Sequence, residues 1–389
     1  LQVLRLAAAM PPDTIPWPWL ETLTKRTNPE VFEPTPQFLK GRWTRIRRTL
    51  EGRDLITEGR HPGTTGRMHR LVVDHLRKQN PQETDLVDEF IVHRAQKLGT
   101  DFTQAPELWE IDSITDALPD ILTRKPELLK QVPNFIRHVA LRYVADTRIT
   151  AMLYDLVEKL SSASTRTAFL AQSLLGDVLQ NTDPAQARES YQRSLAIARH
   201  LAETCPEDLQ ARRDLTVALN NVAGMLKNSD PGRALGLYEE SLDIGRDLAG
   251  RLSGDLQARR DLTVALNNVA GMLRNSDPGR ALGLYEESLD ISRDLAGRLP
   301  GNLQALWDLG VAAARLAQLL PTEDPERIPL WREAAISLRD ALAIQPENKE
   351  LGRMSCLVAL HYADCDPGDR DEWLAYAVGL AERFGFGKE

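Results

Sequence analysis

The sequence has few of the features of a secreted, membrane-spanning or disulfide-stabilised protein. Its 3 cysteines, Cys205, Cys356 and Cys365, form no Cys-x-x-Cys pair, which indicates a reducing compartment and no disulfide framework. No apolar run approaches the ~20 residues that a membrane-spanning helix requires. We therefore expect a soluble, cytoplasmic protein that does not contact a membrane.

Catalytic and phosphate-binding motifs are also missing. The chain has no Gly-x-x-x-x-Gly-Lys-Ser/Thr segment that would cradle the phosphates of a nucleotide. No serine, cysteine or threonine belongs to a recognisable nucleophile motif. His361 and Cys365 are spaced i, i+4 with Cys356 nearby, but a fourth metal ligand is not evident, so the cysteines are interpreted as core residues. We expect no enzyme activity, metal or cofactor in this chain.

Positive charge is not in excess either. A net charge of −8 and a pI near 5.6 argue against a nucleic-acid-binding protein, although they leave room for a local basic patch. At 389 residues the chain is long enough for two or three domains. It begins with Leu1 in what reads as the middle of a helix, so we expect it to be a piece of a longer protein.

What the sequence does contain is a tandem repeat. The segment 208–254 recurs as 255–301 with a period of 47 residues, and the two copies differ only at Lys227/Arg274, Gly245/Ser292 and Ser253/Pro300. Diverged copies in the same register occupy 161–207 and 302–348. Repetition at a few tens of residues is typical of a solenoid, whose usual role is to present a long surface to a partner.

Each copy reads as two helices. Leu219, Val222, Ala223 and Leu226 fall at i, i+3, i+4 and i+7, one face of a first helix. Asp230 and Pro231 then supply a helix cap and a first-turn proline for a second helix. This pattern resembles the tetratricopeptide repeat (TPR). In that repeat the first helix carries a large residue next to a small one, here Ala223, and the second helix carries a small residue, an aromatic and another small residue, here Ala234, Tyr238 and Ser241. The period exceeds the usual 34 residues, so we expect helices of about 20 residues.

The resemblance divides the chain. We expect an all-α protein with four TPR-like repeats over 161–348, a capping helical hairpin over 349–389, and a helical linker over 81–160. Residues 1–80 do not follow the repeat pattern. They contain a basic helix over 38–50 and a closing amphipathic helix, and we expect them to form a winged-helix-like module.

In TPR arrays the first helices of successive repeats line the concave groove. The resemblance therefore implies that Asn220, Lys227, Asn267 and Arg274 project into a groove, with Ser173 and Gln180 at equivalent places in the first copy. Rows of amide and cationic donors suit an extended peptide or an acidic segment of a partner protein. Simple solvation of these side chains is the alternative.

The front module resembles the winged-helix domain of NB-ARC and related STAND signalling ATPases. Ile15-Pro16, Leu55-Ile56 and the Met68-His69-Arg70 segment follow that family's order, with Arg70 where the family has aspartate. The resemblance implies that His69 contacts the β-phosphate of ADP on a nucleotide-binding domain absent from this chain. The order of winged helix, linker and TPR array further implies the sensor half of a bacterial signal-transduction and defence ATPase, with ATP or ADP in a full-length parent and self-association on activation.

Three alternatives remain open from the residues alone. His69 is otherwise a core or helix-start histidine. Arg42, Arg45, Arg47 and Arg48 form either a solvated helix face or a DNA-reading helix, which would make the chain a transcription regulator. A freestanding TPR scaffold would need no nucleotide at all.

Overall fold

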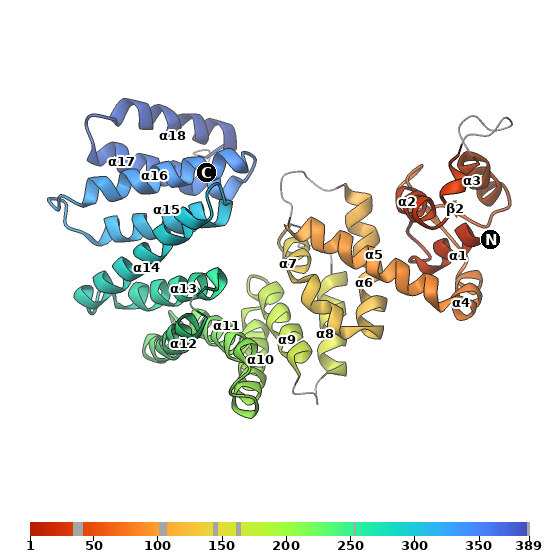
Figure 1. Ribbon diagram of the computed structural model, residues 1–389, viewed down its shortest axis with the longest axis horizontal. Coiled ribbons are helices and arrows are strands. Elements are labelled where there is room, and N and C mark those ends of the chain that lie inside the picture. The colour runs from red at the N-terminus through yellow and green to blue at the C-terminus, as the bar shows by residue number, and fades with distance from the viewer. Residues whose placement is uncertain (34–41, 101–106, 143–146, 161–164, 253, 387–389) are drawn as a thin grey trace. The chain divides into compact units, whose positions relative to one another are not determined.

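The computed structural model describes residues 1–33, 42–100, 107–142, 147–160, 165–252 and 254–386. Its chain divides into two compact units, Leu1–Ser190 and Tyr191–Glu389, which meet inside α10, Pro184–Thr204. Among the described residues the structure is almost wholly helical, as the sequence predicts (Figure 1). None of the described helices is both long enough and apolar enough to cross a bilayer.

The first unit opens with a small mixed module. Its elements are α1 (Gln2–Ala9), β1 (Ile15–Pro16), α2 (Trp17–Thr27), η1 (Pro29–Val31), α3 (Trp43–Gly52), β2 (Thr57–Glu58), β3 (Thr65–Arg67) and α4 (Arg70–Gln79). The three short strands form an antiparallel sheet in the order β1-β3-β2. The basic helix predicted over 38–50 is observed from Trp43 onward, and its first residues lie outside the described part of the chain.

A helical layer completes the first unit. It comprises α5 (Pro81–Thr100), α6 (Leu108–Arg124), η2 (Pro126–Gln131), α7 (Pro133–Arg142), α8 (Arg148–Lys159), α9 (Arg166–Leu179) and the start of α10. The front module packs on this layer through Trp19, which is 3% exposed and meets the rings of Phe90 and Trp109 edge-on. The Trp19 indole Nε1 also donates to Glu110 Oε1 over 3.2 Å. Buried aromatic surface and one satisfied buried polar pair therefore hold module and layer together.

The second unit is a stack of helix pairs. After the end of α10 it contains α11 (Leu209–Leu226), α12 (Pro231–Arg251), α13 (Leu256–Leu273), α14 (Pro278–Arg298), α15 (Leu303–Leu319), α16 (Arg327–Ile344), α17 (Lys349–Cys365) and α18 (Arg370–Phe384). From α11 to α18 each helix packs chiefly against the helix before it and the helix after it. This is the TPR-like α-α repeat that the sequence predicts, and it is visible from green to blue in Figure 1.

Local sequence explains where these helices begin. Asp230 Oδ1 accepts a hydrogen bond from the Arg233 backbone N–H over 3.1 Å, and Pro231 occupies the first turn, as predicted. Asp277 caps α14 in the same way. The first helices of the two near-identical copies have 18 residues and the second helices 21, which confirms the expectation of unusually long helices.

Small residues allow the helices of a pair to approach closely. Ala223 and Ala234 are both 0% exposed, and their equivalents Ala270 and Ala281 are equally buried. Close packing at these positions turns each pair into one unit, and consecutive units bury a continuous core. The helices α17 and α18 pack against each other, and Gly352 lies directly against the ring of Phe384.

Candidate ligand site on the repeat array

A polar cavity in the second unit is lined by residues of the two near-identical copies and of the fourth copy. It has a volume of about 420 Å³ and takes its lining from the ends of α11 and α13 and from α12, α14 and α15. Three of the four predicted groove residues line it: Lys227, Asn267 and Arg274. The sequence therefore places most of these side chains in one site, although their role in binding stays a prediction.

Two buried tyrosines form the floor of the cavity. Tyr238 and Tyr285 are 6% and 4% exposed, and each hydroxyl lies 3.7 Å from where a Cβ on Gly224 or Gly271 would stand. Burial raises the pKa of both phenols; for Tyr285 the charges of Arg315 and Arg274 act in the opposite direction. Neither hydroxyl has a hydrogen-bond partner within the described residues. Two neutral phenols are therefore open to a ligand.

The amide side chains of the site are only partly satisfied. Asn268 Nδ2 donates to Asn220 Oδ1 over 3.5 Å, a bond that joins one copy to the next. Asn220 itself does not line the cavity, so it belongs to the site only through Asn268. Asn267 Oδ1 is buried and has no partner among the described side chains and backbone. Because an unpaired buried amide is costly, Asn267 is the polar group most in need of an external partner.

Three cations line the cavity without a carboxylate. Lys227, Arg274 and Arg315 form no ion pair with any described residue, and the only hydrogen bond of Arg274 runs from Nη1 to Gln318 Oε1 over 3.2 Å. Lys227 and Arg274 are the C-cap residues of α11 and α13, where the free carbonyls and the helix dipole stabilise positive charge. The cations therefore remain available to a ligand.

Other arginines of the array are internally neutralised. Arg213 pairs with Asp255 and Asp261 at 3.2 and 2.9 Å, and Arg260 pairs with Asp308 at 2.6 Å. Arg212 and Arg259 pair in the same way with carboxylates of the following helix, Asp247 and Asp294. The arginines near the start of the first helices are therefore paired with acidic residues of the array. The cavity cations thus differ from these arginines in having no carboxylate nearby among the described residues, and not in residue type.

Some site residues were not anticipated from the sequence. Arg315 and Gln318 belong to the diverged fourth copy, yet the 47-residue period aligns them with Asn268 and Gly271, so the register contained the signal. In the first copy Gln180 is exposed as expected, but Ser173 is 2% exposed and packs in the interior. The expectation that Ser173 projects into a groove is therefore wrong.

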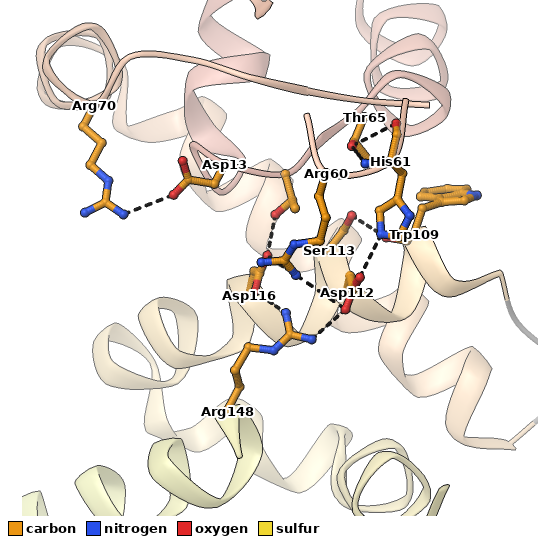
Figure 2. Close-up of polar contacts among 11 residues, drawn as sticks. Asp13, Arg60, His61, Thr65, Arg70, Trp109, Asp112, Ser113, Asp116 and Arg148 are labelled. Carbon is orange, nitrogen blue, oxygen red and sulfur yellow. Dashed lines mark hydrogen bonds and ion pairs between the residues drawn. The ribbon is translucent and has the colours of Figure 1, made fainter. Parts of the chain in front are cut away.

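The second candidate site, in the front module, is centred on His69. This residue is exposed and forms the N-cap of α4, with Nδ1 accepting the Leu71 backbone N–H over 3.3 Å. Its neighbour Arg70 is 77% exposed and reaches Asp13 Oδ2 at 3.1 Å (Figure 2). Of the two interpretations that involve no nucleotide, the helix-start histidine agrees with this geometry and the core histidine does not.

A charge cluster ties the β2–β3 loop to the helical layer. Figure 2 shows Arg60, His61 and Arg148 directed toward Asp112 and Asp116 of α6. His61 Nε2 lies 2.8 Å from Asp112 Oδ2, and Arg148 Nη2 donates to Asp112 Oδ1 over 2.6 Å. Burial opposes ionisation of Asp112, but the hydrogen bonds from Arg148 and His61 outweigh it and hold its pKa below the usual range. The loop is therefore engaged within its own unit.

Comparison with known proteins does not assign the chain to a family. No family model and no curated protein matches the sequence. Among solved structures, a monomeric mutant of IFIT1 with Gppp-AAAA covers 82% of this chain and 68% of its own, at 12% identity and a TM-score of 0.29. The human IFIT1 dimer with m7Gppp-AAAA covers 77% of this chain and 73% of its own, at 12% identity and a TM-score of 0.29. A circular tandem repeat protein covers 80% of this chain and 74% of its own, at 17% identity and a TM-score of 0.26. At TM-scores this low, the likeness is no ground for assigning those ligands to this chain.

Proposed function

We propose that the repeat array is a recognition surface for a protein partner, and that the chain is the sensor half of a STAND-type signalling ATPase. The cavity on the repeat array carries the recognition role, because it gathers on consecutive repeats Asn267, three cations without an ion-pair partner and two phenols without a hydrogen-bond partner among the described residues. Solenoids use such surfaces to hold extended segments of other proteins.

The front module is proposed to relay that event to a nucleotide-binding domain outside this chain. Its helices and strands follow one another in the order expected of a winged helix, with β2 and β3 as the hairpin. His69 is the exposed N-cap of α4, and since its Nδ1 accepts the Leu71 N–H, Nε2 is the ring nitrogen left for a group of another domain. Arg70 is held by Asp13, and its charge is therefore compensated where the family has an acid. ATP or ADP is expected on that other domain only.

Two observations favour relay over DNA binding. Arg47 of the basic helix lies over the Trp17 ring at 4.6 Å and bonds Glu51 and the Gly63 carbonyl, so it is not free to contact a phosphate. Arg60, in the loop that would be the wing, lies 3.6 Å from carboxylate oxygens of both Asp112 and Asp116. Arg47 of the basic helix and Arg60 of the loop are thus engaged by groups of the protein itself, whereas Arg42, Arg45 and Arg48 are exposed.

A comparison of three proteins tests the recognition role. Lysate of the native host is passed over the wild-type chain, over Lys227→Ala/Arg274→Ala/Arg315→Ala, and over Arg233→Ala/Arg353→Ala/Arg370→Ala. The last variant makes the same change in net charge at exposed arginines of the second unit that lie outside the cavity. We expect a host protein that the wild type and the control variant retain and the cavity variant loses. An identical set of captured proteins from all three would refute recognition through this cavity.

A further inference from the structure

We infer that the polar cavity of the repeat array binds an extended acidic peptide segment, whose carboxylates meet Lys227, Arg274 and Arg315 and whose backbone meets Asn267. This inference rests on the proposed role of the array as a recognition surface and specifies the chemistry of its ligand. It follows from three features of the cavity that no contact within the described residues accounts for.

The first feature is the unbalanced charge. The chain has 56 acidic and 48 basic Lys and Arg side chains, so carboxylates are not scarce. Arg212, Arg213, Arg259 and Arg260 all find one, whereas the cavity cations have none within the described residues. Cations that line one concave surface attract and hold anions more strongly than isolated surface charges do. Carboxylates of a ligand are the groups that would complete these pairs.

The second feature is the pair of glycines above the tyrosine hydroxyls. Gly224 and Gly271 lie in the last turns of α11 and α13, and glycine within a helix is unfavourable. A Cβ at either position would meet a tyrosine hydroxyl at 3.7 Å, an ordinary contact distance, so packing alone does not require glycine. Gly271 lines the cavity together with both tyrosines, whereas Gly224 does not, so the missing side chain at Gly271 leaves room for a ligand beside the Tyr285 hydroxyl.

The third feature distinguishes a peptide from a simple anion. The buried Asn267 Oδ1 lacks a donor, and a cation-lined site for an inorganic anion would not supply one. A peptide backbone supplies both an N–H and a C=O, which a side-chain amide can bind together. The combination of an amide with three cations therefore fits a segment that carries acidic side chains along an extended backbone.

Nucleic acid fits the cavity less well. Single strands are held by stacking bases on aromatic faces, but Tyr238 and Tyr285 are 6% and 4% exposed, which leaves little ring surface for a base. Three cations neutralise few phosphates, and the chain as a whole carries a charge of −8. RNA binding is accordingly an outcome that the test must be able to detect.

Fluorescence anisotropy with defined probes tests the inference. The probes are a fluorescein-labelled octapeptide with glutamate at every second position, the same peptide with glutamine, and a labelled octa-adenylate RNA. We expect the glutamate peptide to bind the full chain at least ~10-fold more tightly than the glutamine peptide or the RNA, with affinity that falls as salt rises. Lys227→Ala/Arg274→Ala/Arg315→Ala should weaken it by ~10-fold or more, and Asn267→Leu should weaken the glutamate and glutamine peptides alike.

The control Arg233→Ala/Arg353→Ala/Arg370→Ala should leave binding unchanged. Equal affinity for the two peptides, tighter binding of the RNA, or equal losses in both triple variants would overturn the inference. The lysate comparison tests the recognition role, and the anisotropy experiment tests the acidic ligand, so either hypothesis can fail without the other. A cavity variant that loses its host partner but shows no preference for glutamate would keep the recognition role and refute the acidic ligand. Specific glutamate binding without a cavity-dependent partner would keep the site and refute the role.

Discussion

The Tyr285 hydroxyl lies 3.7 Å from the point at which a side chain on Gly271 would begin. This geometry makes Gly271→Ala an informative change, because alanine improves helix propensity by about 1 kcal/mol and fits without a clash. We expect Gly271→Ala to raise the melting temperature and to weaken binding of the glutamate peptide. Gly283→Ala in α14 is the matched control, since its Cβ would meet nothing within 4 Å. It should raise the melting temperature without any effect on binding, and equal binding losses in both would contradict the assignment.

Leu226→Asp should destabilise the array by roughly 3 kcal/mol or more, because it buries a charge without a partner. Leu226 is 6% exposed in the core of its helix pair. Val217→Asp, at a position 41% exposed on the same helix, is the control and should cost much less. Urea denaturation followed by circular dichroism measures both. A Leu226→Asp protein as stable as the control would mean that the buried face of α11 is wrongly assigned.

Deletion of 208–254 should remove one complete repeat and keep the fold. Glu207 would be followed by Asp255, which opens the same Asp-Leu-Gln-Ala-Arg-Arg segment as Asp208, so the new junction reproduces an existing one. Stability in solenoids is nearly a sum over neighbours, and the shortened array should therefore melt cooperatively with full helicity per residue. Because Lys227 is lost, partner binding should be abolished or redirected. If the shortened protein bound its partner as well as the wild type does, the middle copies would serve only as a spacer and not as the recognition surface.

Asp112→Asn should destabilise the first unit in a pH-dependent manner. The pKa of Asp112 is lower in the folded protein, so ionisation stabilises the fold above the unfolded value of about 3.9 and this contribution disappears as pH falls through the folded value. The stability difference between wild type and variant should be full at pH 7 and should shrink below pH ~4. Urea unfolding followed by tryptophan fluorescence checks this, with Asp155→Asn, an exposed i, i+4 partner of Lys159, as the control. A difference that stays constant down to pH 3 would contradict it.

His69→Ala should loosen the ADP-bound state of a full-length parent and raise its basal activity, if the exposed N-cap histidine contacts nucleotide as proposed. Nucleotide retention after gel filtration and the basal ATPase rate report on this. Since His69 also caps α4, His69→Asn serves as a control that keeps the cap and removes the imidazole. Equal ADP retention in the wild type and both variants would mean that His69 caps the helix and does not contact nucleotide.

The helical repeat could be read from local signals. Asp230 and Pro231 start a helix through contacts with residues at most three positions away, and the spacing of Leu219, Val222 and Leu226 defines the buried face of α11. Such signals act within a few residues and recur with the 47-residue period, so the pairing of helices was predictable. The short strands β1, β2 and β3 were less evident, because strands of two or three residues have no readable alternation.

By itself, the sequence determined the repeat, the helix boundaries and the presence of Lys227, Asn267 and Arg274 on one surface. Only the tertiary structure decided which charges stay unpaired. Arg212 and Arg315 both lie on first helices, yet packing brings Asp247 to Arg212 and no carboxylate among the described residues to Arg315. Likewise, His61 and Asp112 meet across 51 positions of sequence. Ion pairing depends on distances of a few ångströms between side chains from different helices, and these distances are set by packing, which periodicity alone does not specify.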